Sequence, residues 1–102
     1  MARFDVYRFQ SRAAPLVVDV QADILSDLAS RVVVPLAPAD RAEREVLARL
    51  KPKISVEGKD YVFMATDIAA LPVARLGPHV ANLEDDNRDV VTNALDFLFF
   101  GF

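Results

Sequence analysis

The sequence predicts an α+β fold in which several short strands are followed by one long C-terminal helix. Three observations predict it: segments rich in β-branched residues, turn residues such as Gly, Pro and Asp between them, and an amphipathic stretch from Asn87 to Phe102. This order is typical of a small, partly open barrel closed by a helix. A chain of 102 residues is long enough to bury a core, and we expect one domain over residues 1–102.

The first half of the chain contains three predicted strands. The first alternates between two faces, and the second is β-branched and interrupted only by Asp19. Between the second and the third, Ala22–Asp27 holds Asp and Ser residues that favour turns. Pro35 lies late in the third strand, which predicts a strand end or an edge position there. The three ranges are Arg3–Phe9, Leu16–Gln21 and Arg31–Leu36.

The second half begins with Ala37–Leu50, whose pattern fits either a short helix after Pro38 or a charged loop. A hairpin follows, because two apolar runs flank a loop that contains Gly58. The next segment reads as a connection, and a last short strand is ended by Gly77 and Pro78. These ranges are Ile54–Val56 and Tyr61–Ala65 for the hairpin, Thr66–Ala70 for the connection and Val73–Leu76 for the last strand.

The final helix is predicted from about Leu83 to Phe100, with Asn82 and the acidic run Glu84–Asp86 at its start. Gly101 is the residue type that ends helices in the left-handed conformation. One face forms an apolar stripe fit to lie on a sheet, whereas Phe97 and Phe100 point outward. The stripe contains Val91, Ala94, Leu95, Leu98, Phe99 and Phe102. Exposed aromatic rings indicate a partner; the alternative is that they fill the core or a homodimer seam.

Composition excludes several functions. No cysteine is present, and His79 is the single histidine, so we expect it to be solvated and no metal or cofactor to be bound. The net charge of −3 disfavours nucleic acid as the main partner. No apolar stretch is long enough to span a membrane and no signal peptide is visible, so we expect a cytoplasmic protein. The loop residues Asp23, Asp27, Thr66 and Asp67 are better explained as turn formers than as catalytic groups.

Several segments carry a family resemblance over nearly the whole length. They are the F-x-V-Y start at Phe4–Tyr7, VVDVQADIL at Val17–Leu25, RVVVPL at Arg31–Leu36, ATDIAALPV at Ala65–Val73, and the aromatic-Gly-apolar end at Phe100–Phe102. The VDVQ and PL segments together with the terminal Gly are specific in combination. The chain resembles CcdB, the toxin of a bacterial type II toxin–antitoxin pair that poisons DNA gyrase.

The resemblance implies an SH3-like, partly open antiparallel β-barrel with a long C-terminal helix. It also implies a homodimer whose two helix ends lie near the twofold axis. Such a toxin does no chemistry: it binds the gyrase A subunit and stabilises the cleaved gyrase–DNA complex. A CcdA-like antitoxin with a disordered C-terminal segment would wrap the dimer and remove it from gyrase.

The gyrase-binding positions that the resemblance implies are Ala22, Ile24, Asp96, Phe99, Phe100, Gly101 and Phe102. Ile24, Phe99 and Gly101 match the family pattern. Ala22, Asp96 and Phe100 depart from it, since the best-known member has Ser, Asn and Trp there. Replacing Trp by Phe at a hot spot would cost on the order of 1 to 3 kcal/mol. These departures leave open whether gyrase poisoning is retained.

Two alternatives come from other functional classes. The related MazF and Kid toxins use the same barrel as ribonucleases, but this chain lacks their early Arg-Gly-Asp/Glu segment, and its acidic balance disfavours RNA. Because a fold does not fix a function, ribonuclease activity stays an alternative. A toxin relic that only binds antitoxin is the other.

Overall fold

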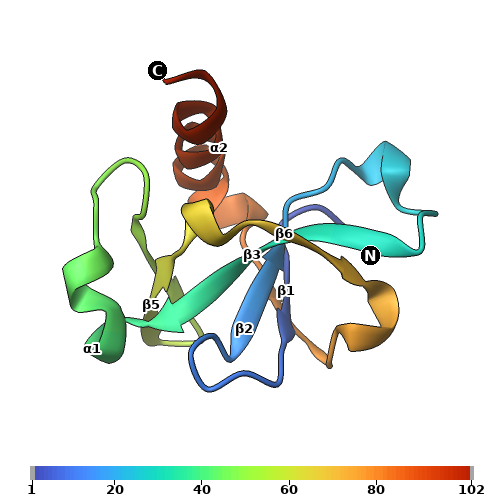
Figure 1. The fold of residues 1–102 in the computed structure, drawn as a ribbon, viewed down its shortest axis with the longest axis horizontal. Helices are drawn as coiled ribbons and strands as arrows, with labels where there is room; N and C mark the ends of the chain where they lie inside the picture. The colour runs from blue at the N-terminus through green and yellow to red at the C-terminus, as the bar shows by residue number, and fades with distance from the viewer. Residues whose placement is uncertain (1, 102) are drawn as a thin grey trace.

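The computed structural model describes residues 2–101, and its centre is a curled antiparallel sheet with helix α2 (Glu84–Phe100) rising from one side (Figure 1). The strand order is β4-β5-β3-β2-β1-β7, and β6 pairs with part of β3. The predicted α+β architecture, a half-barrel with a long C-terminal helix, is confirmed. The strands are β1 (Asp5–Arg8), β2 (Leu16–Asp19), β3 (Ser30–Pro38), β4 (Lys53–Val56), β5 (Lys59–Phe63), β6 (Ala69–Pro72) and β7 (His79–Asn82).

Both faces of the sheet are apolar at its centre, because the β-branched runs of the second and third predicted strands place valines on both faces. Val18 and Val34 belong to the main core with α2, whereas their neighbours Val17 and Val33 lie in a second cluster with Tyr7. Successive side chains of a strand point to opposite faces. The α2 side chains in the main core are Val91, Ala94 and Leu95. The smaller cluster is flanked by Phe9, Leu71 and Leu76.

Strand β3 does not end at Pro35, so the prediction of a strand end or an edge position there is wrong. The strand pairs with β6 over Ser30–Val33 and with β5 over Leu36–Pro38, along the same edge. The Pro35 carbonyl accepts a hydrogen bond from the Met64 N–H at 3.0 Å. The nitrogen and the carbonyl of a residue point to the same side of a strand. The missing N–H of Pro35 therefore lies in the gap between the β6 and β5 pairings, where the sheet loses no ladder hydrogen bond.

The segment Ala37–Leu50, for which the sequence allowed a helix or a loop, is helical only in its first part. It forms α1 (Ala39–Ala42) after Pro38 and the 3-10 turn η2 (Glu43–Glu45), and it continues as a loop with one bridge between Leu47 and Lys51. The predicted hairpin of β4 and β5 is confirmed. Glu57 and Gly58 at its tip both have positive φ, as a type I′ turn requires.

Two predictions for residues 66–82 are wrong. The expected connection contains the start of strand β6, which pairs with β3. The expected strand Val73–Leu76 is a 3-10 turn, η4 (Val73–Arg75), and the chain after Pro78 is strand β7, which pairs with β1. Neither strand is rich in β-branched residues, so pairing with a neighbour, and not local propensity, forms them.

A hydrogen-bonded cluster around Asp5 joins β1 to β7. The Asp5 carboxylate accepts from the Ala2 N–H at 2.8 Å, the Asn82 amide at 2.9 Å and the Tyr7 hydroxyl at 3.1 Å. His79 Nε2 lies 2.9 Å from the same carboxylate, and its ring meets the Tyr7 ring edge-on. The sequence predicted that His79 is only solvated, and this prediction is wrong because the ring contacts Asp5 and Tyr7. Burial and the nearby Asp5 raise the pKa of Tyr7 to about 12.

We expect Asp5→Asn to remove a stabilisation that depends on pH. Burial by itself would raise the pKa of Asp5, but the hydrogen bonds from Asn82, Ala2, His79 and Tyr7 bring it below its ordinary 3.8. A lowered carboxyl pKa contributes stability above pH 3.8 that is lost as the pH falls through the lower, folded value. Urea unfolding at pH 7 should show a loss of about 1 to 2 kcal/mol in the variant.

The difference between the native chain and Asp5→Asn should shrink as the pH falls below about 4. Asp89→Asn is the matched control, since Asp89 is exposed on α2. An unfolding difference that stays constant between pH 7 and pH 3 would contradict the role given to the ionised carboxylate.

Candidate partner-binding site

A hollow of about 370 Å³ lies between the end of β2, the turn after it and the last turns of α2. Ala22 lines it from the β2 side, and Asp96 and Phe99 line it from the helix. Three of the implied site residues therefore share one cavity, although Ala22 is more than 70 positions away from Asp96 and Phe99 in sequence. Its other lining residues are mostly apolar, apart from Arg3 and Gln21.

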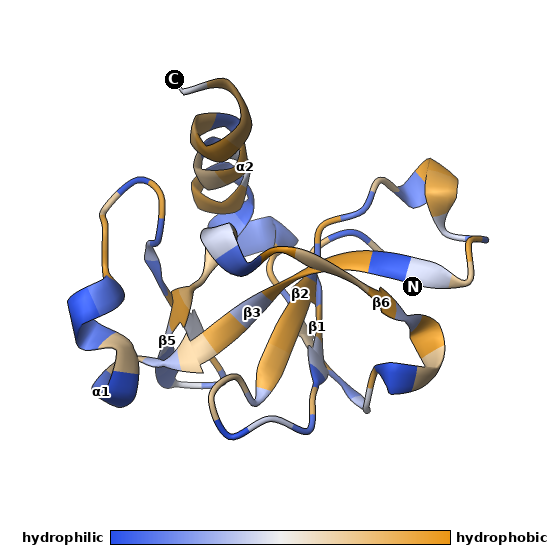
Figure 2. Cartoon of the chain, in the orientation of Figure 1, coloured by the Kyte–Doolittle hydropathy of each residue, from blue (hydrophilic) through white to orange (hydrophobic). Residues whose placement is uncertain are grey.

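Two further implied residues are highly exposed beside this hollow. Ile24 is 90% exposed in the 3-10 turn η1 (Asp23–Leu25), next to Leu25, which lines the hollow. Phe100 is 67% exposed in the last helical turn. Figure 2 shows the apolar end of α2 and the apolar turn η1 rising on the same side of the sheet. Together these residues form an apolar patch that a single partner surface could cover.

The end of α2 extends past the sheet, which changes one prediction. Val91, Ala94 and Leu95 of the apolar stripe are buried and Leu98 packs against the core, but Phe99 is 63% exposed. The stripe repeats to the end of the helix, but the burial of its members falls between Leu95 and Phe99, so the last turn is only partly covered. The reading in which the Phe rings fill the core of the chain is wrong for Phe99 and Phe100.

Three other residues at the C-terminal end of α2 were singled out from the sequence: Phe97, Gly101 and Phe102. Phe97 is half-buried because the Arg49 guanidinium lies 4.6 Å above its ring. Gly101 ends the helix with φ 80°, and its N–H donates to the Phe97 carbonyl at 3.0 Å. The predicted left-handed helix end is thus confirmed. Phe102, also predicted in the site, lies outside the described residues.

The turn that carries Ile24 is held by a buried polar network. Arg31 and Asp19 are both fully buried, and Arg31 Nε donates to Asp19 Oδ2 at 2.8 Å. The Gln21 amide donates to the Leu25 carbonyl at 2.9 Å, and its oxygen accepts from the Val32 N–H at 3.0 Å. Arg31 Nη1 lies 3.5 Å from the same Leu25 carbonyl. The turn is therefore anchored at its inner end, which leaves Ile24 pointing outward.

The sequence analysis did not predict this network, although a single aspartate, Asp19, inside an otherwise apolar strand indicated a buried partner of opposite charge. Burial raises the pKa of Asp19, and the hydrogen bond and charge of Arg31 oppose that rise. Arg31 Nη2 is 2.6 Å from Asp19 Oδ2 without hydrogen-bond geometry, so it counts as a charge contact only. A single buried guanidinium thus balances a single buried carboxylate.

The loop carboxylates considered from sequence take structural roles or stay apart. Asp23 accepts a hydrogen bond from the Arg3 N–H at 2.6 Å, which ties the N-terminal segment to the turn. Asn82, which precedes the N-cap residue Leu83, accepts a hydrogen bond from the Glu84 N–H through its Oδ1 at 2.8 Å, at the start of α2. Within residues 2–101 no group of three or more His, Asp or Glu side chains could hold a metal ion, and no helix is long and apolar enough to cross a membrane.

The half-barrel with a C-terminal helix defines a structural class that includes a solved endoribonuclease. The structure titled "Endoribonuclease in complex with its cognate antitoxin from Mycobacterial species" is similar, with a TM-score of 0.75. The match covers 94% of this chain and 91% of that chain at 20% identity. At that identity the likeness concerns the fold alone.

The family is narrower than the fold. Residues 3–101, nearly the whole chain, match the family described as CcdB protein. The chain belongs to the CcdB family of toxins.

Proposed function

We propose that the chain binds the gyrase A subunit while DNA is cut and traps the cleaved gyrase–DNA complex. The observation that carries this proposal is the hollow in which Ala22, Asp96 and Phe99 meet, with Ile24 and Phe100 exposed beside it. Exposed aromatic and aliphatic anchors around a hollow are what protein interface hot spots use. Membership of the CcdB family supports the choice of gyrase as the partner.

We also propose that the toxin acts as a homodimer in the cytoplasm and is neutralised by a cognate CcdA-like antitoxin. In a twofold dimer with paired helix ends, each apolar patch would occur twice on one face. That arrangement would present two sets of anchors to a symmetric target. The similar solved structure, an endoribonuclease bound to its antitoxin, supports an antitoxin as a partner class.

The proposed mechanism is wedging, without a chemical step by the toxin. Phe99 and Phe100 would insert into the partner, and Asp96 would meet a basic or hydrogen-bonding group there, because burying an unpaired carboxylate is costly. Phe100 offers a ring without an indole donor, so its contribution comes from apolar area alone.

A supercoiled-plasmid assay with the host's gyrase and ATP tests the proposal. The native chain should generate linear DNA, and Phe100→Ala should require on the order of tenfold to a hundredfold more protein for the same cleavage, equivalent to roughly 1 to 3 kcal/mol. Leu47→Ala is the matched control because Leu47 is also exposed, at 53%, but lies in the loop after η2. It should cleave like the native chain.

Absence of linear DNA with all three proteins, while gyrase supercoils normally, would overturn the proposal. The ribonuclease alternative is retained because the solved endoribonuclease has a similar fold. It predicts cleavage of single-stranded RNA in a parallel reaction without gyrase. A relic predicts neither activity.

A further inference from the structure

The hollow at the helix end contains a cation that the family resemblance did not single out. Arg3 lines it from the segment before β1, and Asp96 lines it from α2. No ion pair among residues 2–101 includes either side chain. One positive and one negative group therefore line the same hollow without contacting each other.

Two contacts hold the Arg3 side chain in place. Its Nε donates to the Val20 carbonyl at 3.1 Å, and its guanidinium carbon lies 4.9 Å from the centre of the Phe4 ring. The two terminal nitrogens of Arg3 carry no hydrogen bond within the described part of the chain. A guanidinium with two free amino groups is suited to bind a carboxylate through two parallel hydrogen bonds.

The backbone around Arg3 is fixed as well. Its N–H donates to Asp23 Oδ1 at 2.6 Å. The next residue, Phe4, is buried and has φ 73°, a left-handed conformation that is rare for a bulky side chain. Backbone hydrogen bonds to Asp19 and Leu83 hold Phe4 in this conformation. Arg3 is thus presented by a rigid frame, which lowers the entropy cost of binding a partner group.

We propose that Arg3 is a further partner-binding residue that pairs with a carboxylate of the gyrase A subunit, while Asp96 pairs with a cation beside that carboxylate. The hollow then selects a partner surface that carries both charges. A surface with only one sign would leave the other charge of the hollow buried and unpaired. The inference rests on the proposed function in taking the gyrase A subunit as the partner.

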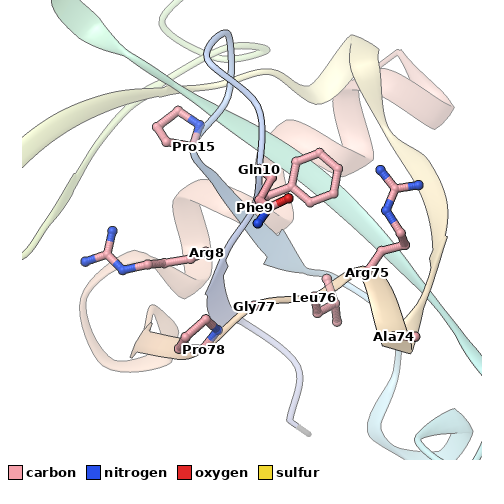
Figure 3. A pocket seen from close by; sticks show the side chains of 9 residues that line it. All are labelled: Arg8, Phe9, Gln10, Pro15, Ala74, Arg75, Leu76, Gly77 and Pro78. Carbon is pink, nitrogen blue, oxygen red and sulfur yellow. The ribbon is translucent and has the colours of Figure 1, made fainter.

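Arg75 offers a matched control on a separate surface. It lines a hollow of about 580 Å³ at the end of β1, and its guanidinium lies 5.6 Å from the centre of the Phe9 ring (Figure 3). Arg3 and Arg75 therefore both place a guanidinium beside a phenylalanine ring. None of the residues that line this second hollow lines the one at the helix end. Replacing Arg75 should leave binding of the gyrase A subunit unchanged.

Isothermal titration calorimetry with the purified gyrase A subunit of the host tests the inference. Arg3→Gln and Asp96→Asn should each raise the Kd about tenfold, as expected for loss of charge-assisted hydrogen bonds. Arg3→Lys keeps the charge and should stay within about threefold of the native Kd. Arg75→Gln should bind like the native chain. Raising NaCl from about 0.05 to 0.3 M should weaken the native chain more than Arg3→Gln.

A native Kd for Arg3→Gln would overturn the inference. Equal losses in Arg3→Gln and Arg3→Lys would also overturn it, because they would assign Arg3 a structural role through its Nε bond. Sedimentation tests a second copy of the chain as the other occupant: weaker self-association of Arg3→Gln would move the pairing into the dimer. No binding by the native chain would overturn the proposed function together with the inference, whereas normal binding without an effect at Arg3 would overturn the inference alone.

Discussion

Arg31→Leu is expected to lower the free energy of unfolding by about 3 to 5 kcal/mol, because it leaves the carboxylate of Asp19 buried without its counter-charge. Both side chains are fully buried, so no water can replace the guanidinium without opening the strand pair. The leucine also removes the contact of Arg31 with the Leu25 carbonyl, which loosens the turn that carries Ile24.

Urea unfolding at pH 7 measures this loss, and Arg88→Leu is the matched control. Arg88 also forms an ion pair, with Glu84 at 3.0 Å, but on the exposed face of α2, where such a pair contributes only about 0.3 to 0.5 kcal/mol. If the two variants lost the same stability, the buried pair would not have the role given to it.

A double variant separates charge from packing. Asp19→Asn combined with Arg31→Leu removes both charges while the amide oxygen at position 19 still accepts from the Gln21 N–H, a bond of 3.0 Å in the native chain. Because the unpaired carboxylate is gone, the double variant should recover about 2 to 3 kcal/mol relative to Arg31→Leu alone. No recovery would assign the loss to packing.

The second large effect is expected from Ile24→Asp, which should weaken the proposed binding to the gyrase A subunit at least about a hundredfold, or about 2.7 kcal/mol. Ile24 is 90% exposed, so its side chain buries little area in the folded chain, and the stability should change by less than about 0.5 kcal/mol. In the complex, the new carboxylate would be buried near Asp96 at an apolar interface.

Isothermal titration calorimetry with purified gyrase A subunit measures the affinity, with Leu47→Asp as the control of equal charge. Sedimentation of the native chain and both variants then shows whether they form the proposed homodimer equally, which separates an effect on the dimer from loss of the partner contact. Unchanged affinity of Ile24→Asp would remove Ile24 from the proposed site. An equal loss in Leu47→Asp would indicate a general effect of charge.

Local patterns predicted the elements whose side chains repeat regularly. The helix was placed within one residue of its observed start, because its cap, its stripe and Gly101 are all encoded nearby. The β4–β5 hairpin followed from Gly58 in its turn. Strands β6 and β7 were missed because both are poor in β-branched residues, and only pairing with β3 and β1 makes them strands.

The same division holds for the candidate site. The sequence by itself determined the half-barrel with its helix and the family, and it placed aromatic residues at the chain end. Only the tertiary structure decided that Phe99 is exposed and that Ala22 shares a hollow with Asp96. It also decided that Asp19 pairs with Arg31. The physical reason is that periodicity fixes which face a residue occupies, whereas where the sheet stops beneath a helix depends on contacts between distant segments.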